Sequence, residues 1–405
     1  YKLYIQKKLY LLFKLIFLIK MQNKTIIGIM TGTSIDNLDI VAANFFVDKN
    51  KKYNFNLLAS DRFPFPLKLQ VEIKRAIDDI ATTSSISQLH FALSVFFAKC
   101  IKKFVENNRL DFRSIDAVAI HGQTVWHNPE NKEFAGEETR STLQLTNASA
   151  LSVLIEKTVV SDFRSADLIL GGQGAPLVPI FDFYFLKSEK NVIALNIGGM
   201  ANITFIPPNA NLQDIIAFDT GCGNVLIDEY VQKYFNIPFD KNGDIARTGK
   251  VNQELLKKLL SIDYFHRAPP KSCGREIFNL NLFENTVKEL NIESELVSCD
   301  AVRTLTELTV ITIANAINYC CKGGEVVVKG GGAENLFLME LLKAKLGEEF
   351  TVLSSDFKGI SSQFYEAIAF AFLGFLTLNG VAGNVPHITG ASQSLVLGSI
   401  SPFQK

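Results

Sequence analysis

Short apolar runs and longer amphipathic stretches alternate through the first half of the chain. Residues 26–30 and 39–46 predict two strands that form a hairpin, with a loop at 31–38. The stretch 67–80 predicts a helix, and so does 87–107, where apolar residues recur at helical spacing. Further apolar runs predict strands at 116–121, 142–145 and 158–161. Strands that alternate with helices indicate an α/β fold.

The second half opens with the same pattern as the first. Residues 192–196 and 203–206 predict strands on either side of a glycine turn, 215–218 predicts a third strand, and 224–234 a helix. Because both halves begin with a strand, a glycine turn and a strand, the sequence indicates a duplication. Further predicted elements are helices at 251–260 and 300–320, a strand at 325–328, and helices after Asn335 and from about Gln363.

The composition narrows the class of protein. At 405 residues the chain is long enough for two domains, and its 41 basic and 41 acidic residues favour no nucleic-acid partner. The six cysteines lack C-x-x-C spacing, so we expect free thiols in a reducing cytoplasm. The five histidines form no zinc motif, and any metal is expected to be Mg²⁺ that arrives with a nucleotide.

Residues 1–20 are apolar but are interrupted by lysines. This stretch is too interrupted to span a bilayer, so we expect no membrane partner. We interpret it as a leader outside the native fold, produced by upstream translation, with Met21 as the true start. A membrane-surface helix and a secretory signal remain as alternatives.

Three glycine-rich turns follow strands at 28–39, 196–202 and 329–335. Glycine after a strand lets backbone N–H groups approach a phosphate, which predicts a nucleotide-dependent phosphotransferase. In the first turn, Asp36 and Asp39 are candidates to orient a magnesium shell, although such a turn can also be an ordinary hairpin. The chain has neither the Walker spacing nor G-x-G-x-x-G, which disfavours P-loop and Rossmann folds.

Asp219 is the candidate catalytic base. It follows an apolar strand and precedes a glycine turn, and partial burial there raises the proton affinity of a carboxylate. The alternative is that Asp219 caps the helix that begins near Asn224.

Polar segments elsewhere supply sugar-binding candidates. Asp162 and Arg164 can bind hydroxyls or a carboxylate, or can form a structural ion pair across their loop. Thr124 is a substrate candidate, whereas His121 is equally well explained as a core histidine whose hydrogen bonds are satisfied. We expect the 330–332 turn to lie against a purine and the 271–276 loop to reach the nucleotide.

These motifs together resemble the anhydro-N-acetylmuramic acid kinases, which belong to the actin and hexokinase-like ATPase superfamily. The resemblance covers about 25–402 and includes the Gly28–Asp39 start, H-G-Q-T at 121–124 and F-D-T-G-C-G-N at 218–224. Further matching motifs are D-F-R at 162–164, G-G-Q-G-A-P-L at 171–177, N-I-G-G at 196–199, K-S-C-G-R-E at 271–276, G-G-G-A-E-N at 330–335, E-A-I-A-F-A at 366–371 and T-G-A at 389–391.

The resemblance implies a two-lobed actin/hexokinase-like fold, with duplicated ribonuclease H-like domains and a nucleotide cleft between them. The predicted N-terminal lobe is 21–188 joined by 380–405, and the C-terminal lobe is 189–379. The implied activity is ATP-dependent opening of 1,6-anhydro-N-acetylmuramic acid to give N-acetylmuramic acid 6-phosphate, in cell-wall recycling. The family also suggests a homodimer, and the implied small-molecule partners are the sugar and ATP with Mg²⁺.

Carried over by motif, Asp219 falls on the family's base. Thr124, Asp162, Arg164 and Glu366 are the sugar-side candidates, and Asp36 is the candidate for holding Mg²⁺ through water. The ATP-binding candidates are Thr31, Gly32, Thr33, Ser34, Ile35, Asp36, Asn37, Leu38, Gly198, Gly199, Gly330, Gly331, Gly332 and Asn335.

The chain departs from the family pattern at Asn37, Cys222 and Cys273, where glycine, proline and threonine are usual. We expect Cys222 to loosen the turn that carries Asp219, and Cys273 to remove a hydroxyl near the nucleotide loop. Two rival functions remain. One is an ordinary hexosamine kinase that uses no water, and the other is a non-catalytic nucleotide or muropeptide sensor, which would not need a base at Asp219. No feature of the sequence favours a scaffold protein.

Overall fold

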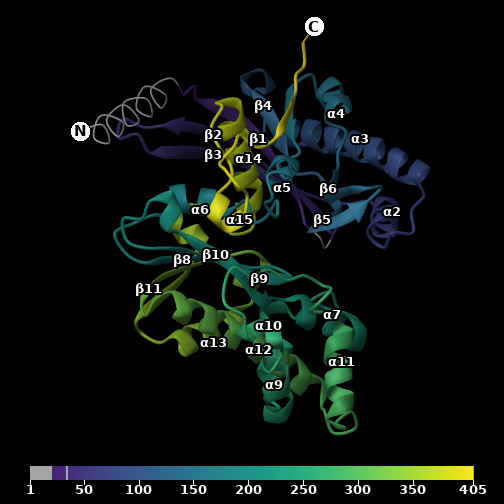
Figure 1. Ribbon diagram of the computed structural model, residues 1–405, viewed down its shortest axis with the longest axis vertical. Coiled ribbons are helices and arrows are strands. Elements are labelled where there is room, and N and C mark those ends of the chain that lie inside the picture. Colours follow the sequence, from purple (N-terminus) through teal and green to yellow (C-terminus); the bar gives the residue numbers. More distant parts are fainter. Residues whose placement is uncertain (1–20, 33–34, 405) are drawn as a thin grey trace. The chain divides into compact units, whose positions relative to one another are not determined.

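The computed structural model describes residues 21–32 and 35–404 (Figure 1). These residues divide into two compact units. Unit 1 comprises the described residues up to 185 together with 366–404, and unit 2 comprises Leu186–Tyr365. The predicted leader at 1–20 lies outside the described residues, as do Thr33 and Ser34.

Unit 1 is built on a six-stranded sheet with the order β13-β7-β4-β1-β2-β3. The first three strands of the chain pair antiparallel, which confirms the predicted hairpin, and β4 and β7 then add in parallel on the other side of β1. The strands are β1 (Lys24–Thr31), β2 (Asn37–Val47), β3 (Tyr53–Pro64), β4 (Ala117–Ile120), β7 (Thr158–Ser161) and β13 (Ser399–Ser401).

Unit 2 is built on a five-stranded sheet with the order β10-β9-β8-β11-β12. Here too the first three strands are antiparallel, and the last two add in parallel beside the first. The strands are β8 (Val192–Ile197), β9 (Met200–Ile206), β10 (Ile216–Cys222), β11 (Gly324–Lys329) and β12 (Phe350–Ser354). Strands β3-β2-β1-β4-β7 of unit 1 have the same order and directions as the five strands of unit 2, and β13 is an extra antiparallel strand at the edge, so the predicted duplicated α/β fold is confirmed.

Helices and a separate hairpin complete unit 1. The helix α3 begins after Thr82, whose side chain accepts a hydrogen bond from the backbone N–H of Ser85, and its apolar face lies in the core. The predicted strand at 142–145 is the end of a longer strand of a two-stranded sheet. The elements are α2 (Leu67–Ile77), α3 (Thr83–Asn107), β5 (Gln123–Phe134), β6 (Glu137–Leu145), α4 (Ala148–Ile155), α5 (Ser165–Ile169), α6 (Pro179–Leu186), α14 (Tyr365–Leu378) and α15 (Pro386–Thr389).

In unit 2, one long helix is buried along most of its length. This helix, α12 (Ser298–Cys320), contributes residues to two hydrophobic clusters of the unit. The other helices are α7 (Val225–Phe235), α8 (Asp244–Thr248), α9 (Gln253–Leu260), α10 (Asp263–His266), α11 (Leu280–Glu289) and α13 (Leu336–Leu346). Short 3-10 helices lie at Phe112–Ser114, Leu212–Asp214, Lys241–Gly243, Gly331–Glu334 and Ser355–Lys358.

The helix α14 packs on the sheet of unit 1 at unusually close range. A Cβ atom on Gly28 of β1 would lie 2.2 Å from the carbonyl oxygen of Ala367, and one on Gly374 would lie 2.5 Å from the Cβ of Ala119 on β4. The contacts therefore group 366–379 with unit 1. The sequence-based division places this segment in the other lobe, because a helix that is apolar on every face does not indicate which sheet it covers.

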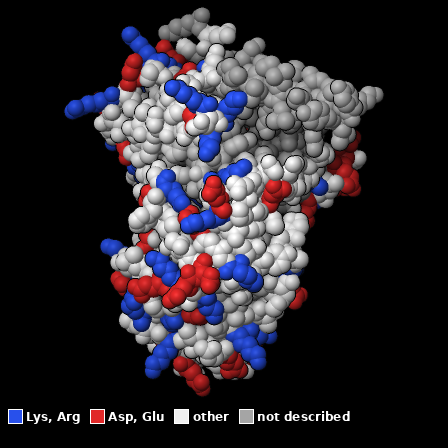
Figure 2. All heavy atoms as spheres, turned by 90° about the vertical axis from the view of Figure 1, so that its left-hand side faces the viewer, with Lys and Arg blue, Asp and Glu red and all other residues white. Residues whose placement is uncertain are grey.

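The surface carries both signs of charge. On the face shown in Figure 2, basic and acidic side chains are interspersed, in keeping with the 41 basic and 41 acidic residues of the chain. Among residues 21–32 and 35–404, no helix has the length and apolar character needed to cross a membrane.

The contact between β1 and α14 predicts a stability effect. Replacing Gly28→Ala places a methyl group against the α14 backbone, and we expect it to lower the free energy of unfolding by about 1–3 kcal/mol, a cost typical of overpacking. Urea unfolding followed by circular dichroism measures it. The matched control is Gly331→Ala, whose Cβ would meet nothing within 4 Å. Equal stability of the two variants would contradict the packing described.

Candidate active site

Asp219 lies at a β-bulge near the end of β10. The pairing with β9 shifts register between Asp219 and Gly221. The backbone N–H of Asp219 donates to the carbonyl oxygen of Lys271 at 3.1 Å, and its carbonyl oxygen accepts from the Tyr264 hydroxyl at 2.8 Å. The segment from α10 to Lys271 therefore fixes the backbone of Asp219 where the strand becomes irregular.

The carboxylate of Asp219 is held at one of its two oxygens. Oδ2 accepts a hydrogen bond from the backbone N–H of Cys273 at 3.0 Å. The N-cap residue of α7 is Asn224 and the Asp219 carboxylate accepts from Cys273 instead, so the capping alternative for Asp219 is wrong. Burial raises the pKa of Asp219 to about 6, the Cys273 N–H opposes this, and the nearby negative charge of Glu276 adds to it.

The turn that carries Asp219 packs tightly against the 196–202 turn. A Cβ on Gly223 would lie 2.3 Å from the carbonyl oxygen of Gly198. The carbonyl oxygen of Gly199 accepts from the N–H groups of Gly223 and Val225, at 2.8 and 3.1 Å. These bonds join the turn between β8 and β9 to the start of α7.

The third glycine turn joins the same cluster in unit 2. Gly330 has a φ of 82° and its Cβ would lie 2.6 Å from Oδ1 of Asn196, while a Cβ on Gly332 would lie 2.2 Å from Cγ2 of Ile197. Gly331 is exposed, and a Cβ there would meet nothing within 4 Å. The glycine turns after β8, β10 and β11 therefore lie together, and only glycine fits at the contacts between them.

Asn335, a predicted ATP-binding residue, has a structural role in the fold. Its Oδ1 accepts a hydrogen bond from the backbone N–H of Leu338 at 3.0 Å, so it caps α13. The G-G-G-A-E-N motif thus combines a glycine turn with a helix start. Its role in binding ATP stays a prediction.

The loop after β1 is described except at Thr33 and Ser34. Thr31 is buried, and its hydroxyl donates to the carbonyl oxygen of Gly122 at 3.2 Å. Ile35 is buried with a φ of 60°, and its N–H donates to the carbonyl oxygen of Gly32 at 3.3 Å. Gly32 itself is exposed, and the next strand begins at Asn37, with Leu38 opposite Thr31 in the ladder.

The two acidic residues of this loop differ in their surroundings. Arg62 donates to both carboxylate oxygens of Asp39, at 2.6 and 3.1 Å. This bidentate pair engages the carboxylate of Asp39, and the expectation that Asp39 orients a magnesium shell stays a prediction. Asp36 is exposed, and its backbone oxygen accepts from the N–H of Phe65 at 3.1 Å, so its role at Mg²⁺ also stays a prediction.

The sugar-side candidates all belong to unit 1. Arg164 donates from Nε to His121 and from Nη1 to the carbonyl oxygen of Gly174, at 3.0 and 2.6 Å. Burial lowers the pKa of Arg164 to about 10, and the negative charges of Glu366 and Asp167 oppose this change. Arg164 and Glu366 therefore lie near each other.

The remaining two candidates have separate positions. Asp162 has a φ of 55°, and its Oδ1 accepts from the backbone N–H of Ser165 at 3.2 Å. No ion pair of the described residues joins Asp162 to Arg164, so the alternative of a structural pair across this loop is wrong. Thr124 lies at the start of β5, half-buried and opposite Gln144.

Two features of this region were not predicted from the sequence. The 271–276 loop contacts Asp219, whereas the sequence suggested that it reaches the nucleotide. The hydroxyl of Tyr264 donates to the backbone oxygen of Asp219. The sequence did not predict this contact, because a tyrosine next to another aromatic residue is typical of a hydrophobic core. The side chain of Cys273 faces Met200, with the two sulfur atoms 3.9 Å apart.

Cys222 is fully buried, and it pairs with Met200 in the ladder between β9 and β10. The turn that carries Asp219 is thus held by strand pairing as well as by its glycines. Whether cysteine loosens this turn stays a prediction.

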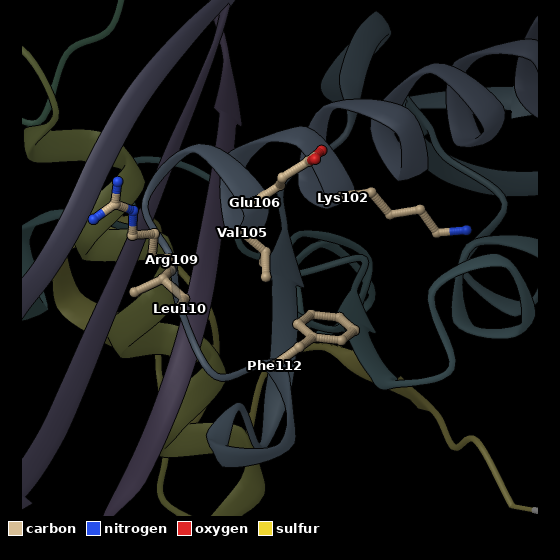
Figure 3. Close-up of a pocket in the computed structure, with 6 residues that line it drawn as sticks. All are labelled: Lys102, Val105, Glu106, Arg109, Leu110 and Phe112. Carbon is tan, nitrogen blue, oxygen red and sulfur yellow. The ribbon is translucent and has the colours of Figure 1, made fainter.

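Two further features lie outside the candidate residues. In the described part of the chain, no group of three or more His, Cys, Asp or Glu side chains is arranged to hold a metal ion. A pocket of about 370 Å³ lies at the end of α3 and contains none of the candidate residues (Figure 3). It is lined by Lys102, Val105, Glu106, Arg109, Leu110 and Phe112.

A likeness among solved structures is distant. Component A of (R)-2-hydroxyglutaryl-CoA dehydratase from Acidaminococcus fermentans is 10% identical, with 87% of this chain and 98% of that chain covered and a TM-score of 0.45. At this TM-score the likeness carries no weight in assigning a function.

Sequence relatives are much closer. The protein named anhydro-N-acetylmuramic acid kinase from Sulfurimonas denitrificans is 38% identical over 92% of this chain and 98% of its own. The protein of the same name from Francisella tularensis subsp. novicida is 37% identical over 94% of this chain and 100% of its own. The profile of the anhydro-N-acetylmuramic acid kinase family matches residues 24–403, which include the glycine turns, Asp219 and the sugar-side candidates. The chain belongs to the anhydro-N-acetylmuramic acid kinase family.

Proposed function

We propose that this chain is an ATP-dependent kinase that opens the ring of 1,6-anhydro-N-acetylmuramic acid by hydrolysis and phosphorylates O6. The products are N-acetylmuramic acid 6-phosphate and ADP, and the role is peptidoglycan recycling and amino-sugar metabolism. The observation that carries the proposal is Asp219, whose carboxylate is held in place and has a pKa raised to about 6. A general base is most effective with a pKa near the working pH.

The reaction couples two bond changes. Oδ2 of Asp219 is occupied by the Cys273 N–H, so Oδ1 takes the proton of a water molecule. The oxygen of this water forms a bond to the anomeric carbon as the bond from that carbon to O6 breaks. The electron pair of the broken bond stays on O6, which attacks the γ-phosphate of ATP and releases ADP. Mg²⁺, when bound with ATP, offsets the negative charge of the transferring phosphoryl group.

The residues proposed for ATP fit phosphate binding by their shape. Gly32, Gly199 and Gly331 are exposed and carry no side chain, so a phosphate can approach their backbone. The proposed set is Thr31 to Leu38, Gly198, Gly199, Gly330 to Gly332 and Asn335, with Asp36 holding Mg²⁺ through water.

For the sugar we propose Thr124, Asp162, Arg164 and Glu366. Arg164 and Glu366 lie close together with opposite charges, and this arrangement can bind both acceptors and donors of a polar sugar. The left-handed backbone of Asp162 and the hydrogen bond from the Ser165 N–H to its Oδ1 together set the direction of the Asp162 side chain.

The two rival functions have less support than the proposed one. A sensor has no use for a base, whereas Asp219 has a carboxyl group with a raised pKa. Three hydrogen bonds, one to the carboxylate and two to the backbone, hold this residue in place. An ordinary hexosamine kinase would use the same base on a sugar hydroxyl, and only the choice of substrate separates it from the proposal. The cytoplasmic location and the homodimer stay predictions.

The role of Asp219 predicts the effect of one substitution. We expect Asp219→Asn to lower kcat for the anhydro sugar about 10²–10⁴-fold, the range for loss of a general base, with no change in the Kd for ATP. Release of ADP and calorimetric titration with ATP measure these two quantities. The matched control is Asp263→Asn, at an exposed position in the segment that backs Asp219. Normal turnover by Asp219→Asn would remove the assignment.

The raised pKa of Asp219 predicts a pH profile. The base acts only when ionised, so kcat/KM for the sugar should be constant above about pH 6 and fall about tenfold per unit below it. Saturating ATP and Mg²⁺ keep protonation of the nucleotide from mimicking this limb. Burial lowers the pKa of His121 well below its ordinary value, so this histidine should not add a step between pH 5 and 8. An acid limb centred near pH 4 would contradict the prediction.

The bond between Cys273 and Asp219 predicts a contrast between two variants. Cys273→Thr keeps the backbone N–H, and we expect kcat to change by less than about twofold, well under the effect of losing a hydrogen bond to a charged group. Cys273→Pro removes the N–H that favours the ionised carboxylate, so the acid limb of the pH profile should move upward. Identical profiles for the two variants, both folded by circular dichroism, would show that this bond does not tune Asp219.

A further inference from the structure

His121 lies in the core of unit 1, directly after β4. Its side chain is buried, and its backbone N–H donates to the carbonyl oxygen of Ile29 at 3.1 Å. The ring packs against Phe370 of α14, with centroids 4.8 Å apart. The imidazole is therefore held between β4 and α14 and has little room to turn.

The partners of the two ring nitrogens identify the tautomer. Nδ1 is 2.8 Å from the carbonyl oxygen of Gly122, which can only accept, so Nδ1 carries the proton. Nε2 is 3.0 Å from Nε of Arg164, which can only donate, so Nε2 is the acceptor. Both bonds require a neutral ring, and burial together with the positive charge of Arg164 lowers the pKa of His121 well below its ordinary value.

Arg164 is held at a second point by a rigid loop. Nη1 donates to the carbonyl oxygen of Gly174 at 2.6 Å. The N–H of Gly174 donates in turn to Oδ2 of Asp167 at 2.8 Å, and the fully buried Asp167 also accepts from Asn384 and Thr389, both at 2.8 Å. Through Asp167, Asn384 and Thr389 of the C-terminal segment thus fix the loop of Gly174, whose carbonyl oxygen accepts the hydrogen bond from Arg164.

These two bonds set the direction of the guanidinium. A free arginine side chain has about 2 kcal/mol of rotamer entropy to lose on binding, and a side chain already fixed has less to lose. Arg164 has five N–H donors, of which the Nε–H and one on Nη1 are used by His121 and Gly174. The remaining donors keep a fixed direction and can meet a ligand.

We propose that His121 is a positioning residue for sugar binding, which acts by accepting from Nε of Arg164 as a neutral imidazole. This inference rests on the proposed role of Arg164 at the sugar. His121 does not touch the sugar in this arrangement. It sets the plane of the guanidinium, so that its loss weakens sugar binding while leaving the nucleotide unaffected.

Two substitutions distinguish the role of Nε2 as an acceptor from the other contacts of the His121 ring. In His121→Gln the amide oxygen can take the place of Nε2 and accept from Arg164. In His121→Asn the shorter amide can replace only Nδ1 and keep the bond to Gly122. We expect His121→Asn to raise the KM for the anhydro sugar about tenfold to a hundredfold, as for loss of a hydrogen bond to a charged group, while the KM for ATP stays unchanged. His121→Gln should keep a KM for the sugar near that of the wild type.

Combining variants tests the path through Arg164. In an Arg164→Ala background, His121→Asn should add no further change to the KM for the sugar, since the group it positions is gone. A full additional effect would overturn the proposal, and so would equal losses in both His121 variants or equal changes in the KM values for sugar and ATP.

A measurement on the wild type keeps the proposal testable if His121→Asn does not fold. Nitrogen-15 NMR of labelled histidine should show His121 neutral, with Nδ1 protonated and Nε2 bare, from pH 5 to 8. A protonated Nε2 would overturn the proposal. Failure of the proposed function is distinguishable, because a wild-type protein without turnover of the anhydro sugar contradicts that function, whereas normal turnover with an unaffected His121→Asn contradicts only this inference.

Discussion

The position of Asp219 depends on one irregularity in the sheet of unit 2. At the end of β10 the ladder shifts register, and the backbone groups of Asp219 are bonded to Lys271 and Tyr264. A β-bulge turns a side chain away from the direction that regular pairing would give it. The Cys273 N–H then fixes one oxygen of the carboxylate and leaves the other for chemistry. Burial at this position also raises the pKa of Asp219 to about 6, which is closer to the pH at which a general base works.

The glycines around this point serve packing as much as ligand binding. Gly223, Gly330 and Gly332 each lie where a Cβ would approach a neighbouring backbone or side-chain atom to under 3 Å. The turns after β8, β10 and β11 consequently form one packed group. Gly199 and Gly331 lie in the same turns but are exposed, and a Cβ at either position would have no close contact. A rigid group of turns with exposed backbone suits a ligand with charged oxygens.

Patterns local in sequence predicted much of this structure. The hairpin of β1 and β2, the repeated strand, turn and strand at β8, and the burial of Asp219 at a strand end all follow from spacing within a few residues. The family motifs located the candidate site residues, whose roles in binding stay predictions.

Contacts between segments far apart in the chain could not be predicted in the same way. The pairing of Asp39 with Arg62 depends on the register of β2 and β3, and the position of α14 depends on which sheet an all-apolar helix covers. The contact of the 271–276 loop with Asp219 joins residues more than fifty positions apart. The hydrogen-bond partner of a backbone N–H or a buried hydroxyl cannot be predicted from a pattern in the sequence.

The central claim is that one base couples attack of water to transfer of phosphate, and the fate of the water oxygen tests it most directly. The reaction would be run with ATP and 1,6-anhydro-N-acetylmuramic acid in oxygen-18 water, and the sugar product analysed promptly by mass spectrometry with fragmentation, so that slow exchange of the anomeric oxygen is corrected with an unlabelled product control. We predict one labelled oxygen at the anomeric position of a 6-phosphate and none in the phosphate group. Phosphorylation of only an open N-acetyl sugar, without label from water, would contradict the account.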